Sequence, residues 1–364
     1  MMTMTLDIDP ICRPTLLVKE SIVRRNIARM LNKVPDSIRF RPHFKTHQSH
    51  TIGAIYRKMG VDKITVSSVE MADYFANDGW NDITIAVPLN ILQLDRVVAL
   101  AQSISVGILI DSKSTADHLL EILNGSEQIN IWLEIDAGYG RTGFKWDCIT
   151  EISACLNAIQ TRHPMIKVNG LLTHSGHSYQ LRSAQDILAL HAQTMIRLTA
   201  VKNEISRPDW CPLISIGDTP SCSTIKSFEG IDEIRPGNFV YYDLTQEQIG
   251  SCTQADIAVA VAAPIIGVYP DRNEVVIYGG AVHFSKEVMD TGSEKVYGYL
   301  VTSSSDGWTP LPRSNRLVKL SQEQGTVKVD SERINSLRVG DLIYIQPIHA
   351  CLAADLLRSH TRVV

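Results

Sequence analysis

Short apolar stretches alternate with helical apolar patterns through the first two thirds of the chain, and this alternation constrains the fold more than any other feature. Eight strand candidates lie at 38–44, 63–66, 82–87, 106–110, 129–135, 168–173, 213–216 and 232–234. Helix candidates between them include 69–77, 91–102, 114–123, 148–160 and 184–204. Eight strand–helix units over roughly 220 residues are typical of a (β/α)8 TIM barrel. A doubly wound open sheet is the alternative fold. It normally has a glycine-rich first strand-to-helix turn, and Lys45-Thr46-His47 contains no glycine.

The last third of the chain has a different pattern. Short strand candidates separated by polar turns occur at 257–268, 274–278, 296–301, 317–320, 326–328 and 341–345. No helical period lies between them, so this part predicts a smaller all-β domain. We therefore expect an N-terminal strand at 1–19 that packs on the β domain, a barrel at 20–250 and the β domain at 251–364.

Composition and charge limit the class of protein. Apolar residues make up 44% and charged residues 20%, which is ordinary for a soluble globular enzyme with a large core. The formal charge of -4 argues against a nucleic-acid partner or an anionic membrane partner. The seven cysteines include no CxxC pair, and the start MMTMTLDIDP has no basic region followed by an apolar core. We expect reduced thiols, no signal peptide and a cytoplasmic location.

The segment RPHFKTHQSH at 41–50 holds one lysine, Lys45, between His43 and His47. A strand candidate precedes it and a helical pattern follows it, so Lys45 is predicted at a strand-to-helix turn, where barrel enzymes collect catalytic side chains. Crowding by Arg41 and by protonated histidines would depress the pKa of the lysine amine. A neutral amine can form a Schiff base with a carbonyl. A solvated basic turn is the other interpretation.

Glycine-containing loops end the last two predicted barrel strands. They read GDTPS at 217–221 and RPGN at 235–238. In barrels these two loops often cradle a phosphate, because glycine lets the backbone approach and neighbouring polar groups donate hydrogen bonds. Gly217 and Gly237 would allow this approach and Thr219, Ser221 and Asn238 could donate, whereas ordinary loop ends are the alternative.

Polar side chains also follow the fifth and sixth predicted strands. The fifth continues into EIDAGYGRTG, which carries Arg141, and the sixth into THSGHSY, which carries His174, His177 and Tyr179. A histidine pair is often only a packed or hydrogen-bonded feature, but at a barrel strand end it can serve in acid–base chemistry. A tight turn with a surface arginine is the alternative for Arg141.

A His-x-Cys pair lies near the C-terminus, in VGDLIYIQPIHACLAAD. On a strand, His349 and Cys351 would point to the same face. Such a pair can hold a divalent metal, zinc first, if the protein or a substrate supplies a third ligand. A buried cysteine beside a chance histidine is the alternative.

With these motifs the chain resembles a known family. RPHFKTH, EIDAGYGRTG, GHSY, GDTPS, EIRPGN and VGDLIYIQPIHAC occur in the order found in the fold-type III pyridoxal-phosphate (PLP) enzymes that group D-threonine aldolase with D-serine dehydratase. Their barrel is similar to that of alanine racemase. The resemblance implies that Lys45 carries PLP as a Schiff base and that His177 is the catalytic base. It also implies cofactor contacts from Arg141, Tyr179, Thr219, Gly237 and Asn238, with Arg141 near the reacting ring, and a zinc or manganese site at His349 and Cys351.

The resemblance further implies a PLP- and metal-dependent lyase that acts on a D-3-hydroxy amino acid. Leu172 stands where the dehydratases often have a cofactor-contacting tyrosine, so the first hypothesis is an aldolase that yields glycine and an aldehyde. The alternative is a dehydratase of D-serine or D-threo-3-hydroxyaspartate that yields a 2-oxo acid and ammonia. An amino-acid racemase or a non-catalytic PLP-binding protein is a further alternative. A homodimer is expected, with a small-molecule substrate and with neither nucleic acid nor membrane as partner.

Overall fold

The computed structural model describes residues 10–123, 128–292 and 294–364. The chain forms two compact units: one comprises Asn26–Phe239 and Gln248–Ser251, and the other comprises the segment up to Arg25, Val240–Glu247 and Cys252–Val364. Residues 1–9 of the expected N-terminal segment, on which the prediction of no signal peptide depends, lie outside the described residues. In the described part no helix is both long and apolar enough to cross a membrane.

The first unit is a barrel of parallel strands, as the alternating pattern predicts. The main strands are β2 (Arg39–Phe40), β3 (Ile64–Val66), β4 (Asp82–Pro88), β5 (Ser105–Ile110), β6 (Ile129–Asp136), β8 (Lys167–Leu172), β9 (Leu213–Ile216) and β10 (Glu233–Ile234), and each pairs with the next around the ring. The short strand β7 (Phe144–Lys145) pairs only with the end of β6. Between β2 and β3 a single bridge, His43 with Thr65, joins the ends of the sheet. This closure excludes the open doubly wound fold.

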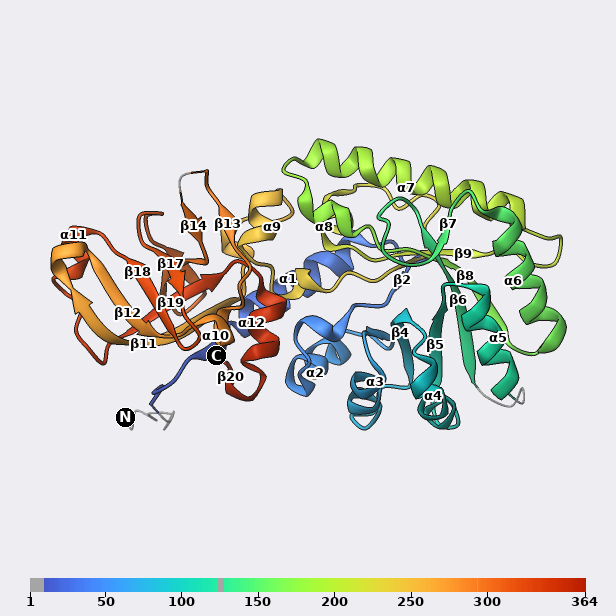
Figure 1. Ribbon diagram of the computed structural model, residues 1–364, viewed down its shortest axis with the longest axis horizontal. Helices are drawn as coiled ribbons and strands as arrows, with labels where there is room; N and C mark the ends of the chain where they lie inside the picture. Colours follow the sequence, from blue (N-terminus) through green and yellow to red (C-terminus); the bar gives the residue numbers. More distant parts are fainter. Residues whose placement is uncertain (1–9, 124–127, 293) are drawn as a thin grey trace. The chain divides into compact units, whose positions relative to one another are not determined.

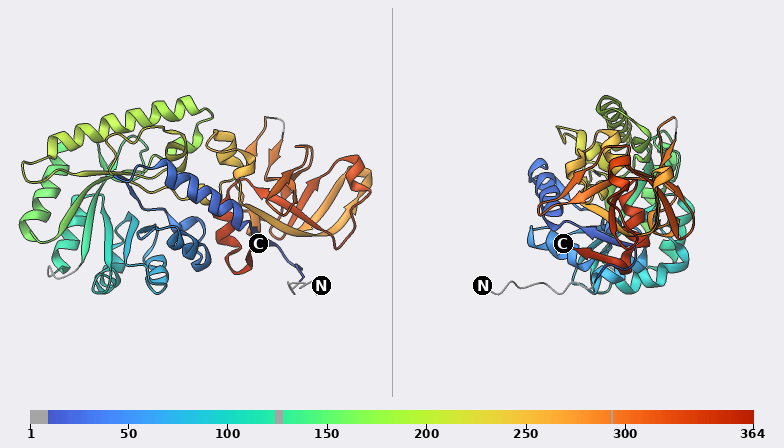
Figure 2. Two further views of the ribbon diagram at one scale, coloured as in Figure 1. Left: turned by 180° about the vertical axis from the view of Figure 1, so that it is seen from behind. Right: turned by 90° about the vertical axis from the view of Figure 1, so that its left-hand side faces the viewer.

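Helices cover the outside of the barrel, and the long helix α7 extends along its strands (Figures 1 and 2). They are α2 (His50–Lys58), α3 (Val69–Ala76), α4 (Leu94–Leu100), α5 (Lys113–Ile122), α6 (Ile149–Arg162), α7 (Ala184–Ile205) and α8 (Thr219–Thr224), with short turns η1 (Phe44–Thr46), η2 (Ile91–Gln93) and η3 (Gly176–Gln180). Serine begins α2, α3, α5 and α7, where Ser49, Ser68, Ser112 and Ser183 accept a hydrogen bond from a backbone N–H of the first turn. These caps satisfy groups that a helix leaves unpaired.

An apolar layer crosses the barrel interior. It consists of Leu109, Trp132 and Leu172 with Ala86 and Leu213 packed against them. Side chains on one face of a strand recur every second residue, so on β6 Asn130, Trp132 and Glu134 face the same way in successive levels. The apolar layer therefore separates the level of Asn130, at the strand starts, from that of Glu134, at the strand ends. We call the strand-end side the barrel mouth.

The second unit is built on an antiparallel sheet that closes into a ring. The ring runs through β11 (Val259–Tyr269), β12 (Glu274–Tyr278), β18 (Gln324–Lys328), β17 (Arg316–Leu320), β15 (Gly298–Ser303) and β19 (Leu342–Pro347), which returns to β11. The terminal strands β1 (Thr15–Val18) and β20 (Thr361–Val363) extend the sheet from β11, and β16 (Trp308–Pro310) adds to β15. A separate hairpin joins β13 (Met289–Asp290) to β14 (Lys295–Val296).

Helical elements in this unit contradict the expectation that no helix lies between its strands. They are α10 (Ala281–Phe284), α11 (Ser331–Ile334), α12 (Ala350–Leu356), η5 (Gln254–Asp256), η6 (Pro270–Arg272) and η7 (Arg358–His360). Figure 1 shows α11 and α12 at opposite ends of the sheet. Each element is too short for a helical apolar period to emerge from the sequence. Three more elements contain or adjoin the boundaries between the units: α1 (Glu20–Lys33), η4 (Asn238–Val240) and α9 (Leu244–Ile249).

Candidate active site

Lys45 lies at the barrel mouth, in the turn η1 between β2 and α2. Its side chain is exposed, whereas Phe44 and Thr46 on either side are buried. The Lys45 backbone N–H donates to Nδ1 of His43 at 3.4 Å. This places the lysine at a strand-to-helix turn, as predicted, although β2 ends at Phe40 and the expected strand to Phe44 is shorter.

His47, two residues after Lys45, holds this turn by packing and hydrogen bonding. Burial lowers the pKa of His47 to about 3. The Ser49 backbone N–H donates to its Nδ1 at 3.1 Å, which requires that this nitrogen carry no proton. The His47 ring stacks on Tyr56 with 5.8 Å between centroids and meets Phe44 edge-on at 4.4 Å. His47 is therefore neutral and serves as part of the core beneath the turn.

Arg41 is held by two carboxylates, which offset the charge that was expected to act on Lys45. Its guanidinium donates from Nε to Glu233 at 2.8 Å and from Nη1 to Asp82 at 2.6 Å. Burial disfavours the charged group, yet the two carboxylates together raise the pKa of Arg41. Its charge is balanced by partners on β4 and β10, which the sequence around Lys45 does not reveal.

Besides Lys45, the cations that act on the histidines at the barrel mouth are Arg141 and Arg235. Burial lowers the pKa of His174 to about 3, and the charges of Lys45, Arg141 and Arg235 lower it further, against a hydrogen bond with the Gly217 backbone. Burial, Lys45 and Arg235 likewise hold the pKa of His43 well below its usual range. The structure thus gathers the ends of β2, β6, β8 and β10 around two neutral histidines.

Arg235 is a residue that the sequence analysis missed. It is 2% exposed, and it donates from Nε to Ser215 Oγ and from Nη2 to the Thr173 carbonyl, both at 2.7 Å. Burial lowers its pKa to about 10, against the nearby charge of Glu233. The sequence signal for this residue is EIRPGN, where an arginine directly follows a predicted inner strand.

Glu134 is a second missed residue. It is 3% exposed, and its Oε1 accepts a hydrogen bond from Thr142 Oγ1 at 2.9 Å. Burial raises the pKa of this carboxyl, although the hydrogen bond from Thr142 and the charge of Arg141 oppose the change. The same loop is tightened by Asp136, whose Oδ1 accepts the backbone N–H groups of Gly138 and Gly140. Arg141 is exposed on this loop, 5.4 Å above the Tyr139 ring.

The loop after β8 brings His177 and Tyr179 to the same end of the barrel. His177 stacks on Tyr139 with 5.6 Å between ring centroids. Burial lowers its pKa, with Asp218 and Asp136 acting against the change. Its Nδ1 is buried and has no hydrogen-bond partner among the described residues. Tyr179 Oη accepts the backbone N–H of Thr219 at 3.5 Å, so the loops after β8 and β9 meet.

The segment after β9 leaves two hydroxyl groups buried without partners, and the loop after β10 brings its backbone close to that of His43. Thr219 Oγ1 and Ser221 Oγ have no hydrogen-bond partner within the described ranges. A Cβ at Gly237 would lie 2.9 Å from the His43 carbonyl, so only glycine allows this approach. Asn238 follows and is 4% exposed. Unsatisfied hydroxyls beside close backbone suit a bound anion, because such groups rarely stay unpaired.

In the second unit His349 is the cap residue of α12 and Cys351 lies in the first turn of that helix, so their placement on a strand is wrong. The two side chains are nevertheless joined by a hydrogen bond. Burial disfavours the protonated imidazole, but this bond and the charges of Cys351, Asp243 and Glu287 raise the pKa of His349 to about 9. Asp243 also holds the turn by accepting the Ala350 backbone N–H at 2.9 Å. Within residues 10–123, 128–292 and 294–364, no three His, Cys, Asp or Glu side chains form a metal-binding group.

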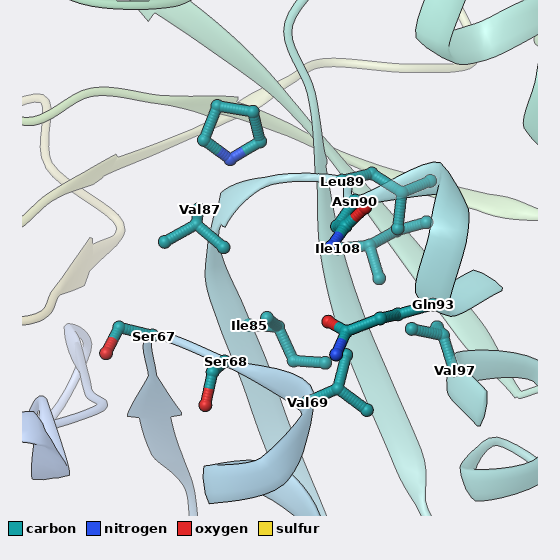
Figure 3. Close-up of a pocket in the computed structure, with 11 residues that line it drawn as sticks. Ser67, Ser68, Val69, Ile85, Val87, Leu89, Asn90, Gln93, Val97 and Ile108 are labelled. Atoms are coloured by element: carbon teal, nitrogen blue, oxygen red, sulfur yellow. The ribbon is translucent and has the colours of Figure 1, made fainter.

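A separate cavity of about 220 Å³ adjoins β4 and β5 (Figure 3). Val69, Ile85, Val97 and Ile108 line it, with Ser67, Ser68, Asn90 and Gln93 among its polar residues. None of the candidate site residues contributes to it, so it has no part in the site described above.

Comparisons with known proteins agree with the two-part architecture. Residues 18–245 match the family of the alanine racemase N-terminal domain, and residues 258–363 match the serine dehydratase domain family. The D-serine dehydratase of Dictyostelium discoideum is 29% identical over 97% of this chain and 94% of its own length. The D-threo-3-hydroxyaspartate dehydratase of Delftia sp. strain HT23 is 27% identical over 93% of this chain and 90% of its own.

Solved structures show the same fold. The structure of the Delftia enzyme matches with a TM-score of 0.86 at 26% identity and covers 94% of this chain and 92% of that one. A cysteine-to-alanine mutant of that enzyme is described as metal-free. D-threonine aldolase from Filomicrobium marinum matches with a TM-score of 0.78 at 18% identity, over 94% of this chain and 89% of that one, which is a likeness of fold alone. The chain therefore belongs to the alanine racemase N-terminal domain family and, with its serine dehydratase domain, is a fold-type III PLP enzyme of the lyase class.

Proposed function

We propose that this protein is a PLP-dependent dehydratase that converts a D-3-hydroxy amino acid, D-serine or D-threo-3-hydroxyaspartate, to a 2-oxo acid and ammonia. The observation that carries the proposal is that two dehydratases align with 97% and 93% of the chain, through both domains. The aldolase hypothesis rested on Leu172, whose contacts with Leu109 and Trp132 in the apolar layer give no chemical preference for an aldolase. The dehydratase alternative is thus the better supported of the two.

The barrel mouth fits the cofactor. The partnerless hydroxyls of Thr219 and Ser221 and the close approach at Gly237 suit a phosphate, and the exposed Lys45 suits a carbonyl. We infer that Thr219, Gly237 and Asn238 hold the phosphate, that Lys45 holds the carbonyl carbon and that Tyr179 and Arg141 contact the ring. When bound, PLP supplies a conjugated ring that accepts the electrons released at the substrate's α-carbon.

The chain's own groups would then move the protons. Lys45 takes the α-proton, and His177, which is neutral and has an unpartnered Nδ1, orients the β-hydroxyl by a hydrogen bond. Loss of the α-proton with the β-hydroxide removes one water. The resulting enamine takes up a proton at its β-carbon to become an imine, and addition of water to the imine then releases ammonia and leaves the 2-oxo acid. Arg141 is the third proposed catalytic residue, and we place its guanidinium near the ring of the cofactor, where the reaction occurs.

The pair His349 and Cys351 offers one nitrogen and one sulfur ligand in contact, beside the negative charges of Asp243 and Glu287. This donor set suits zinc better than the harder manganese, and it holds either ion only if substrate or water completes the coordination. We propose that the pair holds such an ion, and the metal-free cysteine mutant of the Delftia enzyme supports a metal in that relative. A bound divalent ion supplies Lewis acidity toward a hydroxyl.

One incubation tests the reaction type. The purified protein with PLP and zinc or manganese is given D-serine, D-threo-3-hydroxyaspartate and D-threonine in turn, and products are quantified by chromatography. A 2-oxo acid and ammonia in equal amounts are expected from one of the first two substrates. Glycine with an aldehyde would overturn the dehydratase in favour of the aldolase, and the L-amino acid alone would indicate a racemase.

The proposal extends to a homodimer and a cytoplasmic location. None of the seven cysteines forms a disulfide, which agrees with reduced thiols. Light scattering coupled to gel filtration tests the dimer: a mass of twice the 40.4 kDa of the chain is expected. A mass of one chain at micromolar concentration would contradict the expectation.

A further inference from the structure

A second polar cavity, of about 270 Å³, lies at the start of the barrel strands, on the side away from the mouth. Its lining includes the first inward residues of several strands, among them Arg39 of β2, Ser105 of β5 and Lys167 of β8. The apolar layer around Trp132 separates this level from Glu134 and the candidate active site. The cavity is therefore a distinct place in the same barrel.

Positive charge dominates the lining. Arg39, Arg41, Lys63 and Lys167 face a single lining carboxylate, Asp82. Arg41 is already paired with Asp82 at 2.6 Å and with the buried Glu233 at 2.8 Å. The two carboxylates offset two of the four cationic side chains. The cavity wall therefore keeps two positive charges.

The remaining cations have little to neutralise them. Lys63 contacts Asp62 at 2.8 Å, but the Asp62 side chain is 77% exposed, so water screens that pair. Lys167 and Arg39 are exposed at the opening of the cavity. Like charges held at one end of a barrel repel one another and destabilise the fold unless a counter-ion binds.

Polar groups deeper in the cavity can complete a binding site. The amide oxygen of Asn169 is buried and has no hydrogen-bond partner in the described part of the chain. Because the oxygen and nitrogen of an amide can be exchanged by a flip, Asn169 can turn its NH2 group toward an anion. Donors thus converge from β2, from Lys63 just before β3 and from β8, which suits an anion with several oxygen acceptors.

We propose that this cavity binds a small phosphate-class dianion, either inorganic phosphate or the phosphate group of a monoester. Two negative charges match the two positive charges left in the wall, and the volume limits the ligand to metabolite size. Binding would stabilise the folded barrel without reaching the catalytic end, since a ligand that binds only the folded state raises stability by mass action.

The test uses the holoenzyme, so that PLP fills the phosphate-binding loops at the mouth. Inorganic phosphate and glycerol phosphate are titrated separately by calorimetry, with sodium chloride at equal ionic strength as the blank. One binding site is expected in the wild type. Arg39→Gln and Lys167→Gln should each weaken binding at least about ten-fold, because each removes a charged hydrogen bond. Lys167→Arg should retain it.

The matched control is Lys226→Gln, at an exposed lysine outside the cavity, which should bind as the wild type does. Arg39 and Lys167 are exposed, so their variants should fold, and an unchanged cofactor absorbance spectrum checks this. Tighter binding of either phosphate identifies that source as the ligand and supports the site. No binding by the wild type beyond the chloride blank, or binding that survives Arg39→Gln with Lys167→Gln, would overturn the proposal.

Discussion

Two turns in this protein share one pattern and differ in their charge. In each, a histidine lies two residues before a reactive side chain, as His43 before Lys45 and His349 before Cys351. Each turn follows a strand, β2 or β19, and each histidine is the cap residue before a helical element, η1 or α12. The backbone design is therefore the same in both units.

The neighbours of the two histidines are opposite in sign. Burial and the positive charges of Lys45 and Arg235 hold the pKa of His43 well below its usual range. Burial acts in the same direction on His349, but the Cys351 hydrogen bond and the charges of Cys351, Asp243 and Glu287 outweigh it and raise the pKa to about 9. The first turn suits an anionic cofactor and the second suits a cation, because in each turn the residue two positions on and charges from distant segments act with the same sign.

The largest effect is expected at the first turn. Lys45→Ala removes the amine that we assign to the cofactor and to the α-proton, so activity should fall by a factor on the order of 10³ or more. The visible absorbance of the bound cofactor should disappear as well, measured before and after borohydride reduction. Lys226→Gln serves as the control and should keep both the activity and the cofactor absorbance. A reducible adduct that persists in Lys45→Ala would refute the role of this lysine.

The second turn should lose activity without losing the cofactor. Cys351→Ser or His349→Ala should lower activity about 100-fold, because the proposed ion loses one of two protein ligands, while cofactor absorbance stays unchanged. Assays with added zinc or manganese, and after chelation, measure the effect. Full activity of the chelated wild type would show that the reaction needs no metal. The two turns would then differ only in the charges around their histidines.

Acid should weaken the barrel through its neutral histidines. Folding depresses the pKa of His47 and of His174 from 6.5 to about 3, so the unfolded chain binds more protons between these values. The free energy of unfolding should therefore fall as pH drops below 6.5, by about 2 kcal/mol per histidine at pH 5. Urea unfolding across this range measures the slope.

His47→Gln should reduce that slope, whereas His118→Gln, at an exposed position, should leave it unchanged. Equal slopes in wild type and His47→Gln would mean that the buried ring near Lys45 does not couple folding to protonation.

The smallest effect concerns the helices that follow the turns. Ser49 Oγ accepts the Ile52 backbone N–H at 3.4 Å and caps α2, whereas His349 makes no such bond to α12. Ser49→Ala should lower the free energy of unfolding by about 1 kcal/mol, and Ser49→Asp should retain it. Urea unfolding at neutral pH measures both. Unchanged stability in Ser49→Ala would show that packing alone orders the helix after Lys45.

Much of the barrel could be predicted because its signals are local. The period of the apolar residues located the barrel strands, and the polar ends of those strands located Lys45, Arg141 and the loops at 217–221 and 235–238. The errors concern partners across the sheet. Arg41 lies four residues from Lys45 in sequence, yet its charge is taken by Asp82 and Glu233 on other strands.

Sequence alone determined the order of the barrel elements, the family and the turn that carries Lys45, because apolar periodicity and short motifs act within a few residues. Only the tertiary structure decided which charges meet. It placed Arg235 beside His43 and His174, gave His349 its acidic neighbours and gathered Arg39, Lys63 and Lys167 at the strand starts. The physical reason is that the charged form of a buried group depends on burial and on charges a few ångströms away, and barrel closure sets both.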